Sequence, residues 1–237
     1  MSARTISFGA GKQARLLADA RYRAAADLVA ELGLAPPADG RPVILVCGGA
    51  VGLTGRAFDR ARTVIEDAVA PVAGQAGAVV VDGGTAAGTM LLTGVARISQ
   101  PDNLPVLLGV APAGLVSYPG GPSAGVPLDS GHSHFILVPG DQWGGETLML
   151  IEVARAVAGS GPVAVIVAGG GEVTRAEIAA ARDQRWPVFG IAGTGGEADS
   201  SDVVRRVSDV GACARLLSRE LDRSARSRSA SGPRPGV

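Results

Sequence analysis

The residues best suited to chemistry lie where four apolar stretches of the chain end in glycine. These segments are VILVC followed by GGAVGLTG (43–55), VVVDGGTAAGTM (79–90), VAVIVA followed by GGG (163–171) and VFGIA followed by GTGG (188–196). A β-branched run that ends in glycine predicts a buried strand and a tight turn, and backbone N–H groups bind anions where a helix begins at such a turn. The ends of parallel strands meet along one edge of a sheet, which is where ligands bind.

The sequence Asp82-Gly83-Gly84-Thr85 is the most informative of these turns. Gly83 and Gly84 predict a turn too tight for a Cβ atom, and Thr85 is placed to cap the next helix. We expect the two glycines and Thr85 to hold phosphate. Asp82 has two equally supported roles: it accepts hydrogen bonds from ribose hydroxyls, or it accepts the N–H groups of its own turn.

The GGAVGLTG loop (48–55) has the composition of a phosphate cradle. Its alternative role is a close-packed turn between a strand and a helix. Beside the Asp82–Thr85 turn, ligand binding is favoured, because two clusters of backbone N–H groups at neighbouring strand ends form one concavity. The candidate ligand-binding residues in the glycine-rich turns are therefore Gly48, Gly49, Ala50, Gly83, Gly84, Gly169, Gly170, Gly193 and Gly195.

His132 and His134 flank Ser133 just before the apolar segment FILVP (135–139). Alternation along a strand would place both imidazoles on one face, but no third ligand is evident nearby and zinc needs three or four. We therefore predict no metal site. One histidine is expected to contact the ligand or the adjoining loop, and the other to pack.

Trp143 lies in the glycine-flanked segment GDQWGGET (140–147). Its indole either stacks on a base or forms a lid that packs on the core, and the two readings have equal support. Glu146 and Thr147 open the next helix, where an acidic side chain favours the helix dipole. Gly144, Glu146 and Thr147 join the candidate ligand-binding residues.

The bulk properties exclude several classes of protein. The 237 residues are 46% hydrophobic, yet no apolar run approaches the roughly 18 residues of a membrane span. Lys and Arg together number 22, as do Asp and Glu, and aromatic residues are only 3% of the chain, which disfavours nucleic-acid binding. Two cysteines are too few for a disulfide framework, and no signal peptide is visible. We expect a cytoplasmic protein.

Strand-like and helix-like segments alternate along the chain. This order predicts a Rossmann-like, doubly wound α/β fold with a mainly parallel sheet and helices on both faces. Residues 1–40 are expected to add a strand (4–11) and a helix (16–34), residues 41–222 to form the ligand-binding domain, and residues 223–237 to be a disordered tail. The Gly/Pro-rich segment 112–131 predicts a functional or mobile loop. Thr174 and Glu177 match a capping box, which predicts a helix start at Thr174.

Several of these motifs together resemble a known superfamily. GGA after the first strand, DGGT after the second, LDSGHSHFILV (128–138) and the following W-G-x-E-T are similar to prokaryotic SLOG domains related to the N-terminal region of TRPM channels, an LSDAT-like group. The resemblance covers roughly residues 41–200. It implies a Rossmann-like fold akin to LOG, Smf and DprA proteins that binds nucleotide-derived ligands such as ADP-ribose or cyclic ADP-ribose. It also implies a sensor in signalling or defence that needs no further cofactor, forms a homo-oligomer and acts through a separate effector protein.

The same superfamily contains LOG-type phosphoribohydrolases, whose site resembles P-G-G-x-G-T-x-x-E. Here Pro139-Gly140 leads to D-Q-W-G-G-E-T-L-M-L, and Leu150 stands where the glutamate would be. Gly88-Thr89 is followed at the same offset by Leu92. Because hydrolysis needs that acid, we expect a binding domain, with a nucleotide N-glycosidase or phosphoribohydrolase as the alternative.

Overall fold

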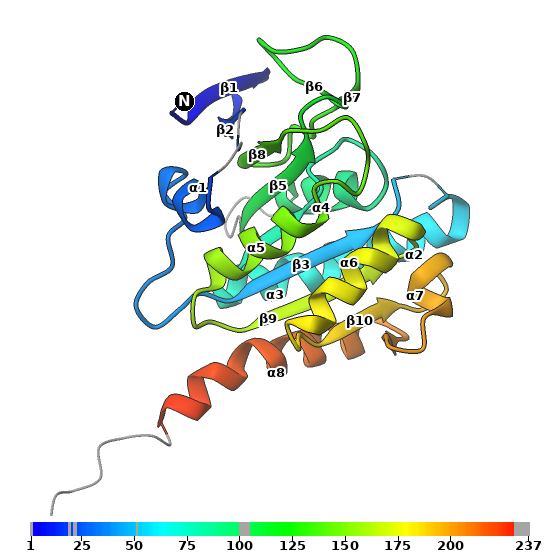
Figure 1. The fold of residues 1–237 in the computed structure, drawn as a ribbon. Coiled ribbons are helices and arrows are strands. Elements are labelled where there is room, and N and C mark those ends of the chain that lie inside the picture. Colours follow the sequence, from blue (N-terminus) through cyan, green and yellow to red (C-terminus); the bar gives the residue numbers. More distant parts are fainter. Residues whose placement is uncertain (1, 19, 21–22, 51, 100–104, 230–237) are drawn as a thin grey trace, which may run out of the picture.

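The apolar runs predicted to be strands form the centre of a nine-stranded sheet (Figure 1). The computed structural model describes residues 2–18, 20, 23–50, 52–99 and 105–229. The strand order is β1-β2-β8-β5-β4-β3-β9-β10-β11, in which β1 and β2 are antiparallel and the other neighbours are parallel. The Rossmann-like α/β prediction is therefore confirmed. The strands of this sheet are β1 (Arg4–Gly9), β2 (Lys12–Leu17), β3 (Val43–Gly48), β4 (Val79–Asp82), β5 (Val106–Pro112), β8 (His134–Val138), β9 (Val163–Ala168), β10 (Val188–Ile191) and β11 (Arg205–Val207).

Helices cover both faces of the sheet, as the continuous burial of β9 requires. Residues of α1, α5 and α6 share one apolar core with one face, and residues of α2, η1, α3, α4 and α8 share a second core with the other. The helices are α1 (Ala25–Glu31), α2 (Gly55–Val64), the π-helical η1 (Ile65–Val69), α3 (Ala70–Ala76), α4 (Gly88–Ile98), α5 (Thr147–Ala158), α6 (Glu172–Asp183), α7 (Gly196–Ser200) and α8 (Val210–Ser229).

The N-terminal region differs from its prediction. Residues 4–17 form a hairpin instead of one strand, and the predicted helix over 16–34 is reduced to α1. The reason is that β2 pairs in parallel with β8, which places Leu16 opposite Phe135 and buries Leu16 and Leu17 on the two faces of the sheet. Tertiary pairing thus overrides the helical spacing of the leucines.

The segment 112–131 is more ordered than a bare loop. It contains two short paired strands, β6 (Val116–Ser117) and β7 (Val126–Pro127). Leu128 forms a β-bridge with Thr85, and the N–H of Ala86 donates to the carbonyl of Pro127. The segment therefore packs against the Asp82–Thr85 turn.

At the C-terminal end, α8 continues to Ser229, past the position 223 at which a disordered tail was predicted. The rest of that predicted tail, residues 230–237, lies outside the described residues. Among the described helices, none combines the length and apolarity needed to span a bilayer.

We expect Leu45→Ala to lower the free energy of unfolding by roughly 2–5 kcal/mol, since Leu45 is fully buried in the central strand β3 and its truncation leaves a cavity. Urea unfolding followed by circular dichroism measures the change. Ile98→Ala is the control, because Ile98 is 41% exposed, and it should shift stability far less. Equal losses in the two variants would contradict the assigned core.

Candidate functional site

A cavity of about 390 Å³ opens at the carboxyl edge of the sheet. The chain leaves β3 toward α2 on one face and leaves the neighbouring β9 toward α6 on the other. Open α/β sheets bind ligands at the point where the connections after two neighbouring strands run to opposite faces of the sheet. The loops after β3, β4, β8 and β9 all contribute to the walls.

One part of this cavity, which we call the glycine half, is built from the turns after β3 and β4. Its lining residues are Gly48, Gly49, Ala50, Gly83, Thr85, Ala87 and Met90. Ala87 and Met90 place the start of α4 at this wall, and the N-terminus of α4 has no side-chain cap. First-turn N–H groups of a helix have no partners within the helix. One of them, that of Thr89, donates to the carbonyl of Gly49, and the N–H of Gly49 donates to the carbonyl of Ala168. The wall therefore offers the positive end of a helix dipole and the N–H groups that these bonds leave free.

The other part, the acid half, comes from the segment after β8 and the first turns of α6. Trp143, Glu146, Glu172, Thr174 and Glu177 line it. Trp143 is 47% exposed, so its indole is open to the cavity and to solvent rather than packed in the core. Glu146, Glu172 and Glu177 give this half its acidic character, and no Lys or Arg lines the cavity in the part of the chain that the structure describes.

Glu146 is the N-cap residue of α5 and is only 6% exposed. Its Oε2 accepts the N–H of Gly144 at 2.8 Å. Burial raises the pKa of Glu146, and hydrogen bonds from backbone N–H groups, its own and that of Gly144, oppose the rise. Glu146 therefore holds the loop before α5 and lines the cavity, and its side chain makes no capping hydrogen bond to α5.

Glu177 was not among the predicted site residues, because Thr174 and Glu177 matched a capping box. In the structure α6 begins two residues earlier, at Glu172, with Gly171 as its N-cap, so the capping-box prediction is wrong. Glu177 instead lies on the buried face of α6 with Thr174 and Ile178. The sequence signal that could have identified Glu177 as a site residue is its position on the apolar stripe of the helix. Burial raises its pKa to about 8; a hydrogen bond from Cys47 opposes this, and the charges of Glu146 and Asp82 add to it.

Asp82 is fully buried and does not line the cavity. Its Oδ1 accepts the N–H of Gly84 at 2.7 Å and lies 2.8 Å from Nε2 of His132, while its Oδ2 accepts the hydroxyl of Thr93 at 2.5 Å. The structure thus supports the local role of Asp82 and leaves no surface of its carboxylate for a ribose.

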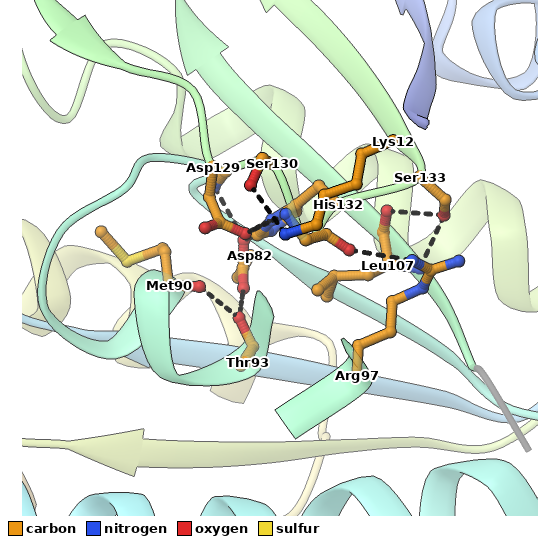
Figure 2. A network of polar contacts seen from close by, with 12 residues as sticks. Lys12, Asp82, Met90, Thr93, Arg97, Leu107, Asp129, Ser130, His132 and Ser133 are labelled. Atoms are coloured by element: carbon orange, nitrogen blue, oxygen red, sulfur yellow. Dashed lines mark hydrogen bonds and ion pairs between the residues drawn. The ribbon is translucent and has the colours of Figure 1, made fainter. Parts of the chain in front are cut away.

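His132 is held between two carboxylates, as Figure 2 shows. Nδ1 lies 2.8 Å from Oδ2 of Asp129, and that oxygen also accepts the N–H of Gly131. Burial alone would lower the pKa of His132, but the charge of Asp82 and the hydrogen bonds of Asp129 and Asp82 outweigh it and raise the pKa to about 9. His132 is therefore a buried imidazolium that ties the loop before β8 to the end of β4, and it does not reach a ligand.

His134 lies in the sheet, where it pairs with Leu108 of β5 and Arg15 of β2. Its Nδ1 is 2.9 Å from the hydroxyl of Ser133, and it does not line the cavity. Burial, with the charges of Arg15 and Arg97, lowers the pKa of His134 to about 4. Neither histidine of the pair therefore lines the cavity, and His132 contacts the adjoining loop, which is the second alternative that the sequence left open.

Gly84 also differs from its predicted role. Its φ is +70°, and a Cβ there would lie 2.8 Å from Cα of Gly109 and 3.1 Å from a ring carbon of Phe135. Gly84 is thus required for close packing of β4 against β5 and β8, whereas its neighbour Gly83 faces the cavity. Thr85 lines the cavity but does not cap α4, whose N-cap is Ala87.

The later glycine turns bond to the protein itself. Asp199 accepts the N–H of Gly193 at 2.9 Å and of Gly195 at 2.7 Å, and Thr194 accepts the N–H of Gly169 at 3.0 Å. The N–H groups of Gly169, Gly193 and Gly195 therefore already have acceptors within the protein. The predicted residues that do not line the cavity are Asp82, Gly84, His132, His134, Gly144, Thr147, Gly169, Gly170, Gly193 and Gly195.

The structure brings some of the predicted site residues together around one cavity. The predicted residues that line one cavity are Gly48, Gly49, Ala50, Gly83, Thr85, Trp143 and Glu146. Residue Val51 of the GGAVGLTG loop lies outside the described residues. Within the described residues, no three side chains of His, Cys, Asp or Glu gather in a way that could hold a metal ion.

The fold and the cavity define a Rossmann-like α/β domain with a ligand-sized site at the carboxyl edge of its sheet. Residues 41–225 match the family model described as SLOG in TRPM, prokaryote, and the chain belongs to this family. A search among curated proteins gave no match.

Matches among the solved structures include two molybdenum cofactor proteins. One is the molybdenum cofactor carrier protein of Chlamydomonas reinhardtii, with 19% identity, a TM-score of 0.50 and coverage of 76% of this chain and 98% of that one. The other is the molybdenum cofactor binding protein of the phototrophic bacterium Rippkaea orientalis, with 16% identity, a TM-score of 0.48 and coverage of 76% and 96%. At 19% identity the likeness to the Chlamydomonas reinhardtii protein concerns the fold alone.

We expect stability to fall as the pH rises from 6.5 to about 9. The folded-state pKa of His132 is about 9 against an ordinary value of 6.5, so the stabilisation from its charge is complete below 6.5 and is lost as the pH passes through 9. A shift of this size corresponds to roughly 3 kcal/mol. Urea unfolding of wild type and His132→Gln across this range isolates the contribution, because other groups titrate in both proteins. The same pH dependence in both would contradict a buried imidazolium.

Proposed function

We propose that the protein binds a nucleotide-derived molecule, of the ADP-ribose or cyclic ADP-ribose type, in the cavity at the carboxyl edge of the sheet. The observation that carries this proposal is the glycine half, where the turns of Gly48–Ala50 and Gly83–Thr85 meet the uncapped start of α4. Backbone N–H groups at a helix N-terminus suit phosphate oxygens. The volume of about 390 Å³ lies within the rough range of 300–1,000 Å³ found for small-molecule sites.

The remaining walls suit a nucleoside. Trp143 offers a half-exposed indole for stacking on a base. Thr174 and the acids of the acid half offer acceptors for ribose hydroxyls and for amino groups. In keeping with its family, we propose that the domain is a sensor in signalling or defence.

Hydrolysis of an N-glycosidic bond is a second candidate function, and one observation favours it. The buried Leu150 stands where LOG-type enzymes carry their acid, but Glu177 supplies a carboxyl group to the same cavity from α6. Its pKa, which burial raises to about 8, keeps it protonated at pH 7, as a proton donor to a leaving base requires. Water would add to the ribose carbon as the bond to the base breaks.

Gly83→Val tests the binding site. A Cβ at Gly83 makes only an ordinary contact of 3.6 Å with the side chain of Met90, so the variant should fold, while its methyl groups occupy the glycine half. We expect its affinity for ADP-ribose, measured by calorimetric titration, to fall at least about tenfold, the equivalent of 1.4 kcal/mol.

Gly211→Val is the matched control for this experiment. Gly211 lies in α8 and does not line the cavity, and a Cβ there meets the flexible end of Arg215 at 3.1 Å and makes an ordinary contact of 3.4 Å with Oδ1 of Asp209. Circular dichroism and thermal melts establish that both variants are folded. A folded Gly83→Val protein with wild-type affinity would place the ligand elsewhere.

Incubation with AMP, NAD and ADP-ribose, followed by chromatography, separates the two candidate functions. We expect bound nucleotide to be recovered intact. Release of free base or of ribose 5-phosphate at a rate that Glu177→Gln abolishes would instead establish the hydrolase.

A further inference from the structure

The two halves of the cavity differ in charge, and this difference bears on which nucleotides can bind. The glycine half presents uncharged backbone donors, whereas three glutamates line the acid half and no basic side chain among the described lining residues offsets them. Arg175 of α6 follows the lining residue Thr174 in the sequence, but its guanidinium is paired with Glu197. Its Nε and one terminal nitrogen lie 2.9 and 2.8 Å from Oε1 of Glu197.

We propose that the acid half makes the site selective for nucleotides with a free ribose 2′-hydroxyl and excludes those with a 2′-phosphate, so that the ligand is derived from NAD and not from NADP. This inference rests on the proposed function, since it assumes that the glycine half holds the 5′-phosphate groups. The nucleoside, with its ribose, then lies toward Glu146, Glu172 and Glu177.

The chemistry follows from the donors and acceptors on each side. A carboxylate accepts hydrogen bonds from hydroxyl and amino groups, and an acid at this edge of a dinucleotide fold holds the 2′-hydroxyl, whereas a 2′-phosphate requires a nearby arginine. Like charges placed together in a shielded site repel each other strongly. A phosphate that faced these glutamates would have no cation to compensate it.

The raised pKa of Glu177 reflects mainly its burial, with a smaller part from neighbouring negative charges. Burial raises the pKa of Glu177, and the charges of Glu146 and Asp82 raise it further, although Cys47 donates a hydrogen bond that opposes the rise. The charge that opposes a 2′-phosphate therefore comes from Glu146 and Glu172, because Glu177 is protonated at pH 7. A 2′-phosphate would bring a charge of nearly −2 to the same wall.

Titration with AMP and with adenosine 2′,5′-bisphosphate tests the inference directly, because the two differ only in the 2′-phosphate. Wild-type protein should bind AMP at least about tenfold more tightly at low ionic strength, and added salt should reduce this ratio. The double variant Glu146→Gln/Glu172→Gln should bring the ratio close to one, mainly by tighter binding of the bisphosphate.

Glu152→Gln is the control, because it removes one negative charge from α5 at a residue that does not line the cavity. It should leave the ratio unchanged. Equal or tighter binding of the bisphosphate by the wild type would overturn the inference while leaving the proposed function in place. Failure of both nucleotides to bind, together with failure of ADP-ribose to bind in the calorimetric titration, would overturn the proposed function and this inference with it.

Discussion

The hydrogen bonds of His132 with Asp82 and Asp129 join the parts of the chain on which the site depends. Asp82 ends β4, Asp129 and His132 precede β8, and Thr93 belongs to α4, so a single buried cluster fixes a strand end, a loop and a helix relative to one another. Asp82, Asp129 and His132 are each at most 5% exposed. Removal of one partner would leave a buried charge uncompensated. The free energy of unfolding lost in this way is much larger than the net stabilisation that the ion pair provides.

The cavity follows from this arrangement. Because Asp82 is bonded inward to Gly84 N–H, the turn after β4 presents Gly83 and Thr85 outward to the cavity. The loop 112–131 packs on the same turn through Leu128 and Pro127. Asp82 of DGGT and His132 of GHSH thus lie behind the cavity wall, and the side chains that line the cavity include Thr85, Trp143 and the glutamates.

The sequence predicted the parallel sheet and its edge correctly because β-branched runs that end in glycine have few alternatives to a buried strand. It placed the turns of Gly48–Ala50 and Gly83–Thr85 in one site for the same reason. It could not show that Asp82 and His132 meet across 50 residues, since a buried ion pair and a ligand contact use the same residue types. Glu177 was missed because its local pattern fits a helix cap, and only the true start of α6 at Glu172 turns it into the cavity.

A crystal structure of the protein with ADP-ribose is the most direct measurement of the central claim. The account predicts the diphosphate within hydrogen-bonding distance of the backbone at Gly83–Thr85 and the first turn of α4, with the adenosine between Trp143 and the glutamates of the acid half. Density for ADP-ribose at another position, such as the surface between α6 and α7, with the cavity holding only water, would contradict it.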